Sequence, residues 1–321
     1  MNRIPSNYYF RTVEFTLQTG CPVMCDFCPQ DLFMKRYGLI EKFTIDNFKL
    51  ALFNLKNSTV KTIQFSGFSE PLYNKNISDF IKLSIDSGFE VEIFTTLKGF
   101  NFEQIKKLKD LPIKWYISIQ PLGMRNRKGL KDEEAWNNIR SFLELNLNSQ
   151  PIFRCVNINL SKEQKTQLNK KGKEIGIKNI IFPHFETRAG NIIQNGINIS
   201  GKKILCKNDI TPVILPNGNV ALCCMDFGLR NIIGNIFQES FNNILFSDRL
   251  YKIIAIMNAK EKGSILCHTC ESAIPVPFFI SIANYAKAKK IINLIVNSIL
   301  PSGSKRKEKV KTIFKKFGVH Q

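Results

Sequence analysis

Three cysteines stand close together near the start of this 321-residue chain, where Cys21, Cys25 and Cys28 follow the spacing CxxxCxxC. A tetrahedral zinc site takes four protein ligands, and a four-iron cluster binds one cysteine at each iron. Three thiolates on one loop fill neither site, so a cluster held by them keeps one iron open to another ligand. Because the loop follows an apolar run at 12–18, the sequence places this open metal centre at the end of a strand.

A second set of cysteines lies in the C-terminal third of the chain. Cys206 and Cys223 stand on either side of PNGN, a strong hairpin signal, and Cys267 and Cys270 form CxxC. Four thiolates suit either an iron–sulfur cluster without an open iron or a zinc site, and the spacing alone permits both. Adjacent strand residues point to opposite faces, so we expect Cys223 to be a ligand and its neighbour Cys224 not to be one.

Strand-like and helix-like segments alternate over the first 190 residues and must position the first cysteine loop. The strand-like runs lie at 12–18, 60–66, 91–96, 113–120, 151–160 and 178–185, and the helix-like segments lie at 43–55, 77–88, 101–110, 132–147 and 161–176. Thr44, Ser78 and Ser161 are placed as N-caps, and Gly88 and Gly176 just after C-termini. This order predicts right-handed βαβ units and a parallel sheet.

One face of these strands is polar in strand after strand, as at Glu14, Gln64, Ser118 and Asn157. A closed eight-stranded barrel fills its interior with branched apolar side chains. The pattern therefore predicts a partial (β/α)6 TIM-like barrel whose lumen holds a large polar ligand.

Two further residues of the predicted barrel are candidates for catalysis. Cys155, placed on the polar face of the fifth strand, could donate a hydrogen atom or a proton, or could be a small buried residue. His184 ends the sixth strand beside Glu186 and Arg188, where it could orient a hydroxyl or a phosphate, or serve the link between domains.

The pattern divides the chain into three parts. We expect a barrel at 10–190, a small domain with a β-hairpin and a helix at 200–275, and a basic helical tail at 276–321. The tail either packs on the body and ends in a solvated basic run, or lies peripherally on the inner face of a membrane. Without an export signal or a run of ~18 apolar residues, the sequence predicts a cytoplasmic protein.

The net charge of +20, from 46 Lys and Arg against 26 Asp and Glu, should attract anions. Nucleic acid, an anionic membrane and a phosphorylated substrate all fit this charge, and a nucleotide bias of the source genome would produce it too. Nine cysteines in a reducing compartment indicate metal binding more than disulfides.

The first cysteine loop, with aromatic Phe27 before its last cysteine, and the segment GFSEP at 67–71 resemble the radical S-adenosylmethionine (SAM) superfamily. The resemblance implies a 4Fe–4S cluster whose open iron is chelated by SAM. It also implies that Ser69 stands where a glycine is usual, and that Phe27 packs by the adenine. The other residues that it assigns to SAM are Gly67, Phe68, Ser69 and Glu70 for the amino group, and Ser118, Gln120, Asn157 and Asn159 for the ribose and carboxylate.

The second cysteine set, with Gly218 in its hairpin, resembles the SPASM and twitch extensions that carry auxiliary iron–sulfur clusters. Four ligands and no cysteine after Cys270 imply the shorter twitch type with one auxiliary 4Fe–4S cluster. A zinc site with the same four ligands is the alternative.

The resemblance implies an activity. An external one-electron reductant such as flavodoxin or ferredoxin feeds the first cluster, SAM is cleaved to methionine and a 5′-deoxyadenosyl radical, and that radical takes a hydrogen atom from substrate. The auxiliary cluster would accept the electron, so we expect oxidation of a sugar or cyclitol, phosphorylated, nucleotide-linked or lipid-linked. The alternatives are a maturase of peptides or proteins and, more remotely, a zinc-binding nucleic-acid module, although no nucleic-acid module is evident.

Overall fold

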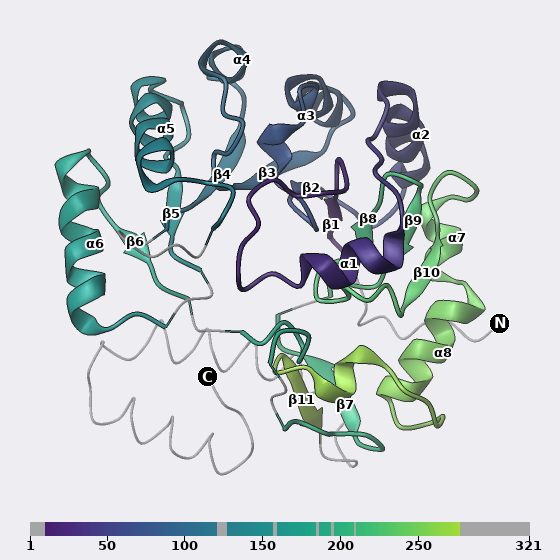
Figure 1. Cartoon of the computed structure of the whole chain (residues 1–321). Helices are drawn as coiled ribbons and strands as arrows, with labels where there is room; N and C mark the ends of the chain where they lie inside the picture. The colour runs from purple at the N-terminus through teal and green to yellow at the C-terminus, as the bar shows by residue number, and fades with distance from the viewer. Residues whose placement is uncertain are drawn as a thin grey trace, which may run out of the picture.

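Six parallel strands follow one another in chain order across the barrel part of the molecule (Figure 1). The computed structural model describes residues 10–120, 127–156, 159–183, 186–193, 196–208 and 210–276. The strands are β1 (Thr12–Phe15), β2 (Thr62–Phe65), β3 (Glu90–Thr95), β4 (Ile113–Ser118), β5 (Ile152–Arg154) and β6 (Ile180–Ile181). Each pairs in parallel with the next, so the partial barrel predicted from the sequence is confirmed.

Helices follow the strands and cover the outer side of the sheet. They are α2 (Ile45–Leu55), η1 (Pro71–Tyr73), α3 (Ile77–Asp86), α4 (Phe102–Lys106), α5 (Asp132–Glu144) and α6 (Lys162–Glu174). A further helix, α1 (Gln30–Tyr37), follows the cysteine loop and was not expected from the sequence. The N-caps predicted at Thr44 and Ser161 are confirmed, since both side chains accept backbone N–H groups. The N-cap predicted at Ser78 is wrong, because the fully buried Ile77 already belongs to α3 and Asn76 precedes it.

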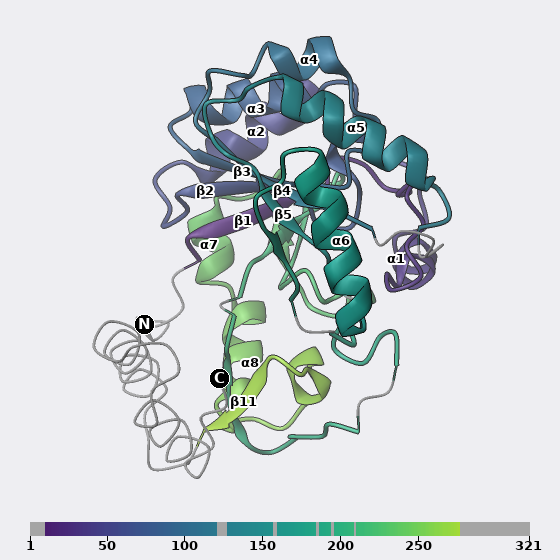
Figure 2. The ribbon, with the colours of Figure 1, turned by 90° about the vertical axis from the view of Figure 1, so that its left-hand side faces the viewer.

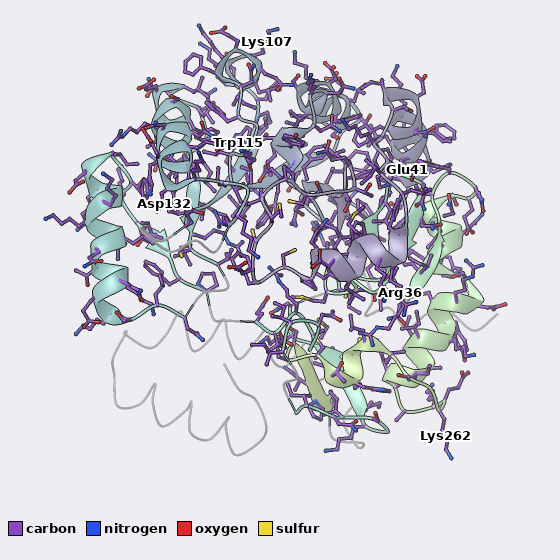
Figure 3. The ribbon with its side chains drawn as sticks, in the orientation of Figure 1. Arg36, Glu41, Lys107, Trp115, Asp132 and Lys262 are labelled. Atoms are coloured by element: carbon purple, nitrogen blue, oxygen red, sulfur yellow. The ribbon has the colours of Figure 1, made fainter. Side chains whose placement is uncertain are left out.

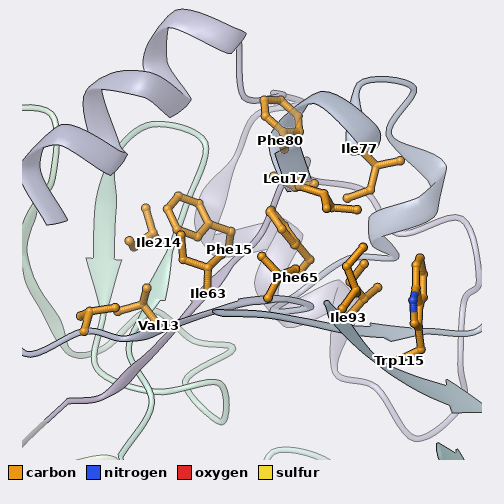
Figure 4. Close-up of a cluster of buried hydrophobic side chains, with 14 of the residues drawn as sticks. Val13, Phe15, Leu17, Ile63, Phe65, Ile77, Phe80, Ile93, Trp115 and Ile214 are labelled. Atoms are coloured by element: carbon orange, nitrogen blue, oxygen red, sulfur yellow. The ribbon is translucent and has the colours of Figure 1, made fainter. Parts of the chain in front are cut away.

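The hydrophobic core lies between the sheet and these helices (Figure 4). Phe15, Phe65 and Trp115 point from their strands toward the helices and are almost fully buried. Since side chains alternate along a strand, the residues between them belong to the opposite face. We call this opposite face the inner face. Glu14 and Gln64 lie on it as register partners, and so do Phe94 and Tyr116.

The C-terminal part extends the barrel sheet and adds a small sheet of its own. Its strands are β7 (Lys203–Cys206), β8 (Val213–Ile214), β9 (Asn219–Ala221), β10 (Ile232–Asn235) and β11 (Ala273–Val276). The hairpin predicted at PNGN joins β8 to β9, with Gly218 at φ +82°. In the described residues β8 also pairs in parallel with β1, giving a nine-stranded sheet in the order β10-β9-β8-β1-β2-β3-β4-β5-β6.

The one helix expected in the small domain at 200–275 is two helices, because a second N-cap interrupts it. The helices are α7 (Phe241–Leu245) and α8 (Asp248–Met257), with Ser240 and Ser247 as their N-caps, and η2 (Leu266–Thr269) follows. Figure 2 shows α8 and β11 on the side of the sheet opposite to α2, α3 and α4, so the C-terminal elements lie toward the inner face.

Charged side chains project from the outside of the molecule. Lys107 and Lys262 point outward, whereas Trp115 lies within (Figure 3). None of the helices in the described ranges is long and apolar enough to span a membrane. The helical tail expected at 276–321 falls, from residue 277 onward, outside the described residues.

Candidate functional site

The first cysteine loop connects β1 to α1 and brings its three thiols together. The Cys28 N–H donates to the Cys25 carbonyl at 3.1 Å. The pKa of both Cys21 and Cys28 is raised to about 12, mainly by burial and in smaller part by the charge of the neighbouring Cys25. A thiol binds metal as the thiolate, so three thiols with a raised pKa need a nearby cation to ionise them. The iron ions of an iron–sulfur cluster provide that positive charge.

A second loop holds the cysteine loop in place. The N–H groups of Lys128 and Gly129 donate to the carbonyls of Met24 and Val23 at 3.2 and 2.9 Å. Arg127 connects this loop to the barrel, since its Nη1 donates to the Ser118 carbonyl at 2.9 Å. A Cβ atom on Gly129 would lie 1.7 Å from the Pro22 carbonyl oxygen, so the two loops meet at backbone distance.

We therefore expect Gly129→Ala to displace the cysteine loop. A contact of 1.7 Å with backbone cannot be relieved by a side-chain movement. After anaerobic iron–sulfur reconstitution, the variant should contain about four irons fewer per chain than the wild type. Gly228→Ala is the matched control, because the nearest atom to its added Cβ is the Arg230 side chain at an ordinary 3.4 Å. Equal iron in the Gly129 variant and the wild type would contradict this account of the loop.

The segment GFSEP forms a turn after β2 that also requires glycine. Gly67 has φ +65°, and a Cβ there would lie 2.1 Å from Thr16 Oγ1. The same Thr16 oxygen accepts the Phe68 N–H at 3.0 Å. Ser69 Oγ is buried and has no hydrogen-bond partner among the described residues, so a polar ligand in this turn would find an unused donor.

The side chains of two other residues in this segment, Glu70 and Phe68, make contacts within the protein. The Glu70 carboxylate accepts four hydrogen bonds, from Leu72 N, Thr95 Oγ1, and Thr96 N and Oγ1, which use its four acceptor positions. The Phe68 ring packs 4.7 Å from both Phe33 and Phe227. Glu70 therefore fixes the turn to the end of β3, and Phe68 offers a ligand only its backbone.

The structure describes four of the remaining site candidates and leaves two undescribed. Ser118 lies at the end of β4, where its carbonyl binds Arg127. Gln120 is buried; its amide donates to Leu130 O and Asp132 Oδ1, and its Oε1 has no partner in the described part of the chain. Phe27 is half-buried in the cysteine loop, and Asn159 is exposed. Asn157 and His184 lie outside the described residues.

The expectation that Cys155 shares the polar face is wrong. The register pairs Tyr116 with Ile152 and Ser118 with Arg154, so Ile152 and Arg154 are the residues of β5 that belong to the inner face. Cys155 belongs to the hydrophobic core and is 2% exposed. The error came from extending the alternation back from Asn159, whereas the ladder of β5 ends at Arg154.

A buried carboxylate, Glu14, joins the inner face to the C-terminal part. It accepts hydrogen bonds from Ser66 Oγ at 2.9 Å and Gly67 N at 3.0 Å. Burial raises the pKa of Glu14, while hydrogen bonds from Ser66 and Cys224 and the charge of Arg188 oppose that rise. The same Arg188 charge opposes the rise that burial causes in the pKa of Cys28. Arg188 therefore lies within electrostatic range of both the cysteine loop and Glu14.

Five cysteines line one cavity of about 130 Å³, namely the four expected ligands and Cys224. Cys206 ends β7, Cys223 follows β9, and Cys267 and Cys270 lie in and just after η2. The pKa of Cys267 is raised to about 12, mainly by burial and in smaller part by the charges of Cys270 and Cys206. Burial likewise raises the pKa of Cys223, with Cys267 as the next cause, whereas the Cys224 thiol bonds to Glu14. The set Cys206, Cys223, Cys267 and Cys270 thus surrounds a space of its own.

The arrangement of thiols bears on which metal group each site could hold. Within the described ranges, no three His, Cys, Asp or Glu side chains converge on a single ion position. The cysteines of a four-iron cluster bind different irons around a larger body, so the thiols that hold a cluster need not meet at one point. Three thiols in one loop and four around one cavity are donor sets that suit such clusters.

Comparisons with known proteins agree with this geometry. Residues 206–271 match the SPASM family, described as an iron–sulfur cluster-binding domain. The structure of BtrN in complex with AdoMet and 2-DOIA is similar at a TM-score of 0.53 and 16% identity, covering 85% of this chain and 94% of BtrN. No curated protein sequence matches the chain significantly.

Two peptide-bound structures are similar to the same extent. Streptococcus suis SuiB bound to precursor peptide SuiA has a TM-score of 0.58 and 15% identity, covering 82% of this chain and 70% of SuiB. Native anSMEcpe with bound AdoMet and Cp18Cys peptide has a TM-score of 0.55 and 14% identity, covering 81% of this chain and 86% of that one.

The comparisons therefore show the fold of the chain and one of its domains. The chain has the same partial-barrel fold as BtrN and SuiB. Residues 206–271, which follow that barrel, match the SPASM iron–sulfur cluster-binding domain.

Proposed function

We propose that this protein is a radical SAM enzyme that oxidises a sugar or cyclitol. The observation that carries the proposal is the pair of cysteine sets, one with three thiols and one with four, that lie toward the inner face of a partial barrel. The three-cysteine set leaves a position for SAM, whereas the four-cysteine set leaves no position for a ligand. The second set is therefore suited to electron transfer.

The chain offers a specific set of groups to the cofactors. Cys21, Cys25 and Cys28 would hold a 4Fe–4S cluster, and the unused Ser69 Oγ and Gln120 Oε1 would meet polar groups of SAM. Gly67 and Glu70 shape the turn that places Ser69. When bound, the cluster and SAM supply a 5′-deoxyadenosyl radical, which removes a hydrogen atom from substrate. The protein contributes orientation and the exclusion of water.

The choice of substrate rests on the similarity to BtrN. That protein was solved with AdoMet and 2-DOIA, and the similarity spans 94% of its chain. A peptide is the second candidate, because SuiB and anSMEcpe were solved with peptides and are similar at comparable TM-scores. An external one-electron reductant of the flavodoxin or ferredoxin type completes the proposal.

The proposal is tested by product analysis under anaerobic conditions. The reconstituted protein, reduced with dithionite in the presence of SAM, should form 5′-deoxyadenosine and methionine. Panels of sugars and cyclitols, each with and without a phosphate group, and of short peptides should then be compared for stimulation of 5′-deoxyadenosine formation. A sugar or cyclitol that stimulates formation of 5′-deoxyadenosine, and in which a hydroxyl group becomes a carbonyl group, supports the proposed oxidation. Stimulation by peptides alone would favour the maturase, and no cleavage of SAM would refute both.

Cys267→Ser should remove the auxiliary cluster and spare the first one. Serine keeps the size of the side chain but lacks the thiolate that iron–sulfur clusters use. We expect iron to fall by about four per chain. Formation of 5′-deoxyadenosine should continue while oxidised product disappears.

Cys224→Ser is the matched control, because Cys224 bonds to Glu14 and is not assigned to the cluster. The iron content of this variant should equal that of the wild type. Loss of iron from Cys224→Ser with full retention in Cys267→Ser would contradict the assignment of Cys223 and Cys267 to one site.

A further inference from the structure

Two arginines on the inner side of the barrel lack full partners. Arg154 ends β5, and its Cζ lies 5.1 Å from the centroid of the Phe94 ring. That ring in turn stacks on Tyr116 at 4.2 Å with an interplanar angle of 9°. The described residues provide no hydrogen bond or ion pair to the Arg154 guanidinium. The aromatic stack therefore holds Arg154 in one orientation and leaves its N–H groups available.

The chain places Arg188 in an unfavourable backbone conformation. Arg188 and Ala189 both have positive φ, 53° and 55°, which is unfavourable for a residue with a side chain. The C-terminal part stabilises this turn, since Glu271 Oε2 accepts hydrogen bonds from Thr187 Oγ1 at 2.9 Å and Ala189 N at 3.1 Å. A strained turn fixed from a second segment indicates that the position of Arg188 matters for function.

The Arg188 guanidinium is itself incompletely bonded. Its Nε is buried and has no hydrogen-bond partner in the described residues. Its Nη1 lies 3.8 Å from Glu186 Oε2 and 4.0 Å from the Met225 sulfur, both longer than a direct charged hydrogen bond. With 24% of its side chain exposed, Arg188 is shielded from much of the water that would otherwise solvate it.

The two guanidiniums act on each other. Burial lowers the pKa of Arg154, and the positive charge of Arg188 lowers it further, while Glu186 opposes the shift. The acidic groups that face the pair are Glu186 and the buried Glu14. Two like charges in a partly buried place are unfavourable unless an anion joins them.

We propose that Arg154 and Arg188 bind a phosphoryl group of the substrate. This inference rests on the proposed function and narrows its substrate to a sugar or cyclitol that carries a phosphate monoester. A phosphoryl group suits the pair because its double charge and three acceptor oxygens can engage two guanidinium forks. A carboxylate offers a single charge and two oxygens. The net charge of +20 would also attract a phosphorylated substrate to this protein.

The test compares ligands that differ in one phosphate. Full-length, anaerobically reconstituted protein with SAM is titrated calorimetrically with glucose 1-phosphate, with glucose and with inorganic phosphate, at about 0.15 M salt to screen surface charges. Arg154→Gln and Arg188→Gln each remove one guanidinium. Arg140→Gln is the matched control, because Arg140 is exposed on α5 and its loss changes the net charge equally.

We expect glucose 1-phosphate to bind the wild type more tightly than glucose does. Arg154→Gln and Arg188→Gln should each weaken the binding of glucose 1-phosphate at least about tenfold, and Arg140→Gln less than about twofold. Weaker binding of inorganic phosphate than of the ester would assign the site to a phosphorylated substrate. Tighter binding of inorganic phosphate would overturn that assignment.

Three other results would overturn the proposal. They are equal losses in all three variants, no loss in either pair variant, and a loss of SAM affinity as large as the loss of phosphate affinity. The last result would give the pair to the SAM carboxylate. Failure of the proposed function is seen separately, as the absence of 5′-deoxyadenosine from reduced wild-type protein, whether or not phosphate esters bind.

Discussion

Cys25→Ala should abolish the cleavage of SAM while leaving the C-terminal cluster in place. Cys25 is the central member of the first cysteine loop in the sequence and lies within electrostatic range of both Cys21 and Cys28. Two thiolates cannot hold a cluster that needs a protein ligand at three irons. We expect about four irons fewer per chain and 5′-deoxyadenosine at background level.

The control for this prediction is Cys155→Ala, which removes a thiol of the hydrophobic core. Its iron content should match that of the wild type, because Cys155 is buried in the hydrophobic core and belongs to neither cysteine set. It should lose stability instead, since it leaves a small cavity in the core. Full SAM cleavage by Cys25→Ala would contradict the assignment of the first loop to the SAM-binding cluster.

Gly67→Ala should weaken SAM binding by at least about tenfold, which corresponds to about 1.4 kcal/mol. The added Cβ would lie 2.1 Å from Thr16 Oγ1, which also receives the Phe68 N–H. The turn must then shift, and Ser69 shifts with it. Equilibrium binding of SAM to the reconstituted protein measures the effect.

Gly88→Ala separates this effect from the general strain of a positive φ. Gly88 has φ +88°, but its added Cβ would meet no atom within 4 Å. We expect that variant to lose about 1–2 kcal/mol of folding stability and to bind SAM normally. Equal SAM affinity in both variants and the wild type would show that the GFSEP turn does not contact SAM.

The local parts of this site were predictable from sequence. The spacing of Cys21, Cys25 and Cys28 and the GFSEP turn lie within short segments, so their chemistry can be recognised without the fold. The alternation of strands and helices likewise predicted the barrel, because each unit is encoded by its own periodicity.

The contacts between distant segments were not predictable. The loop of Arg127 and Gly129 contacts the cysteine loop, although about one hundred residues separate the two loops in the sequence. Strand β8 pairs with β1, although about two hundred residues separate these strands. Arg154 was missed because a shift of one residue exchanges the two faces of a strand. The sequence did contain a signal for the correct assignment. Arg154 stands between the apolar residues Phe153 and Cys155, which are both buried in the core, so Arg154 belongs to the opposite face.

The most direct test of the account is a count of iron, sulfide and zinc in protein purified without oxygen. The account predicts about eight irons and a matching amount of sulfide per chain, from one cluster on each cysteine set. About four irons with one zinc would keep SAM cleavage but remove the internal electron acceptor. Zinc without iron would contradict the central claim that this barrel holds an open iron–sulfur cluster for SAM.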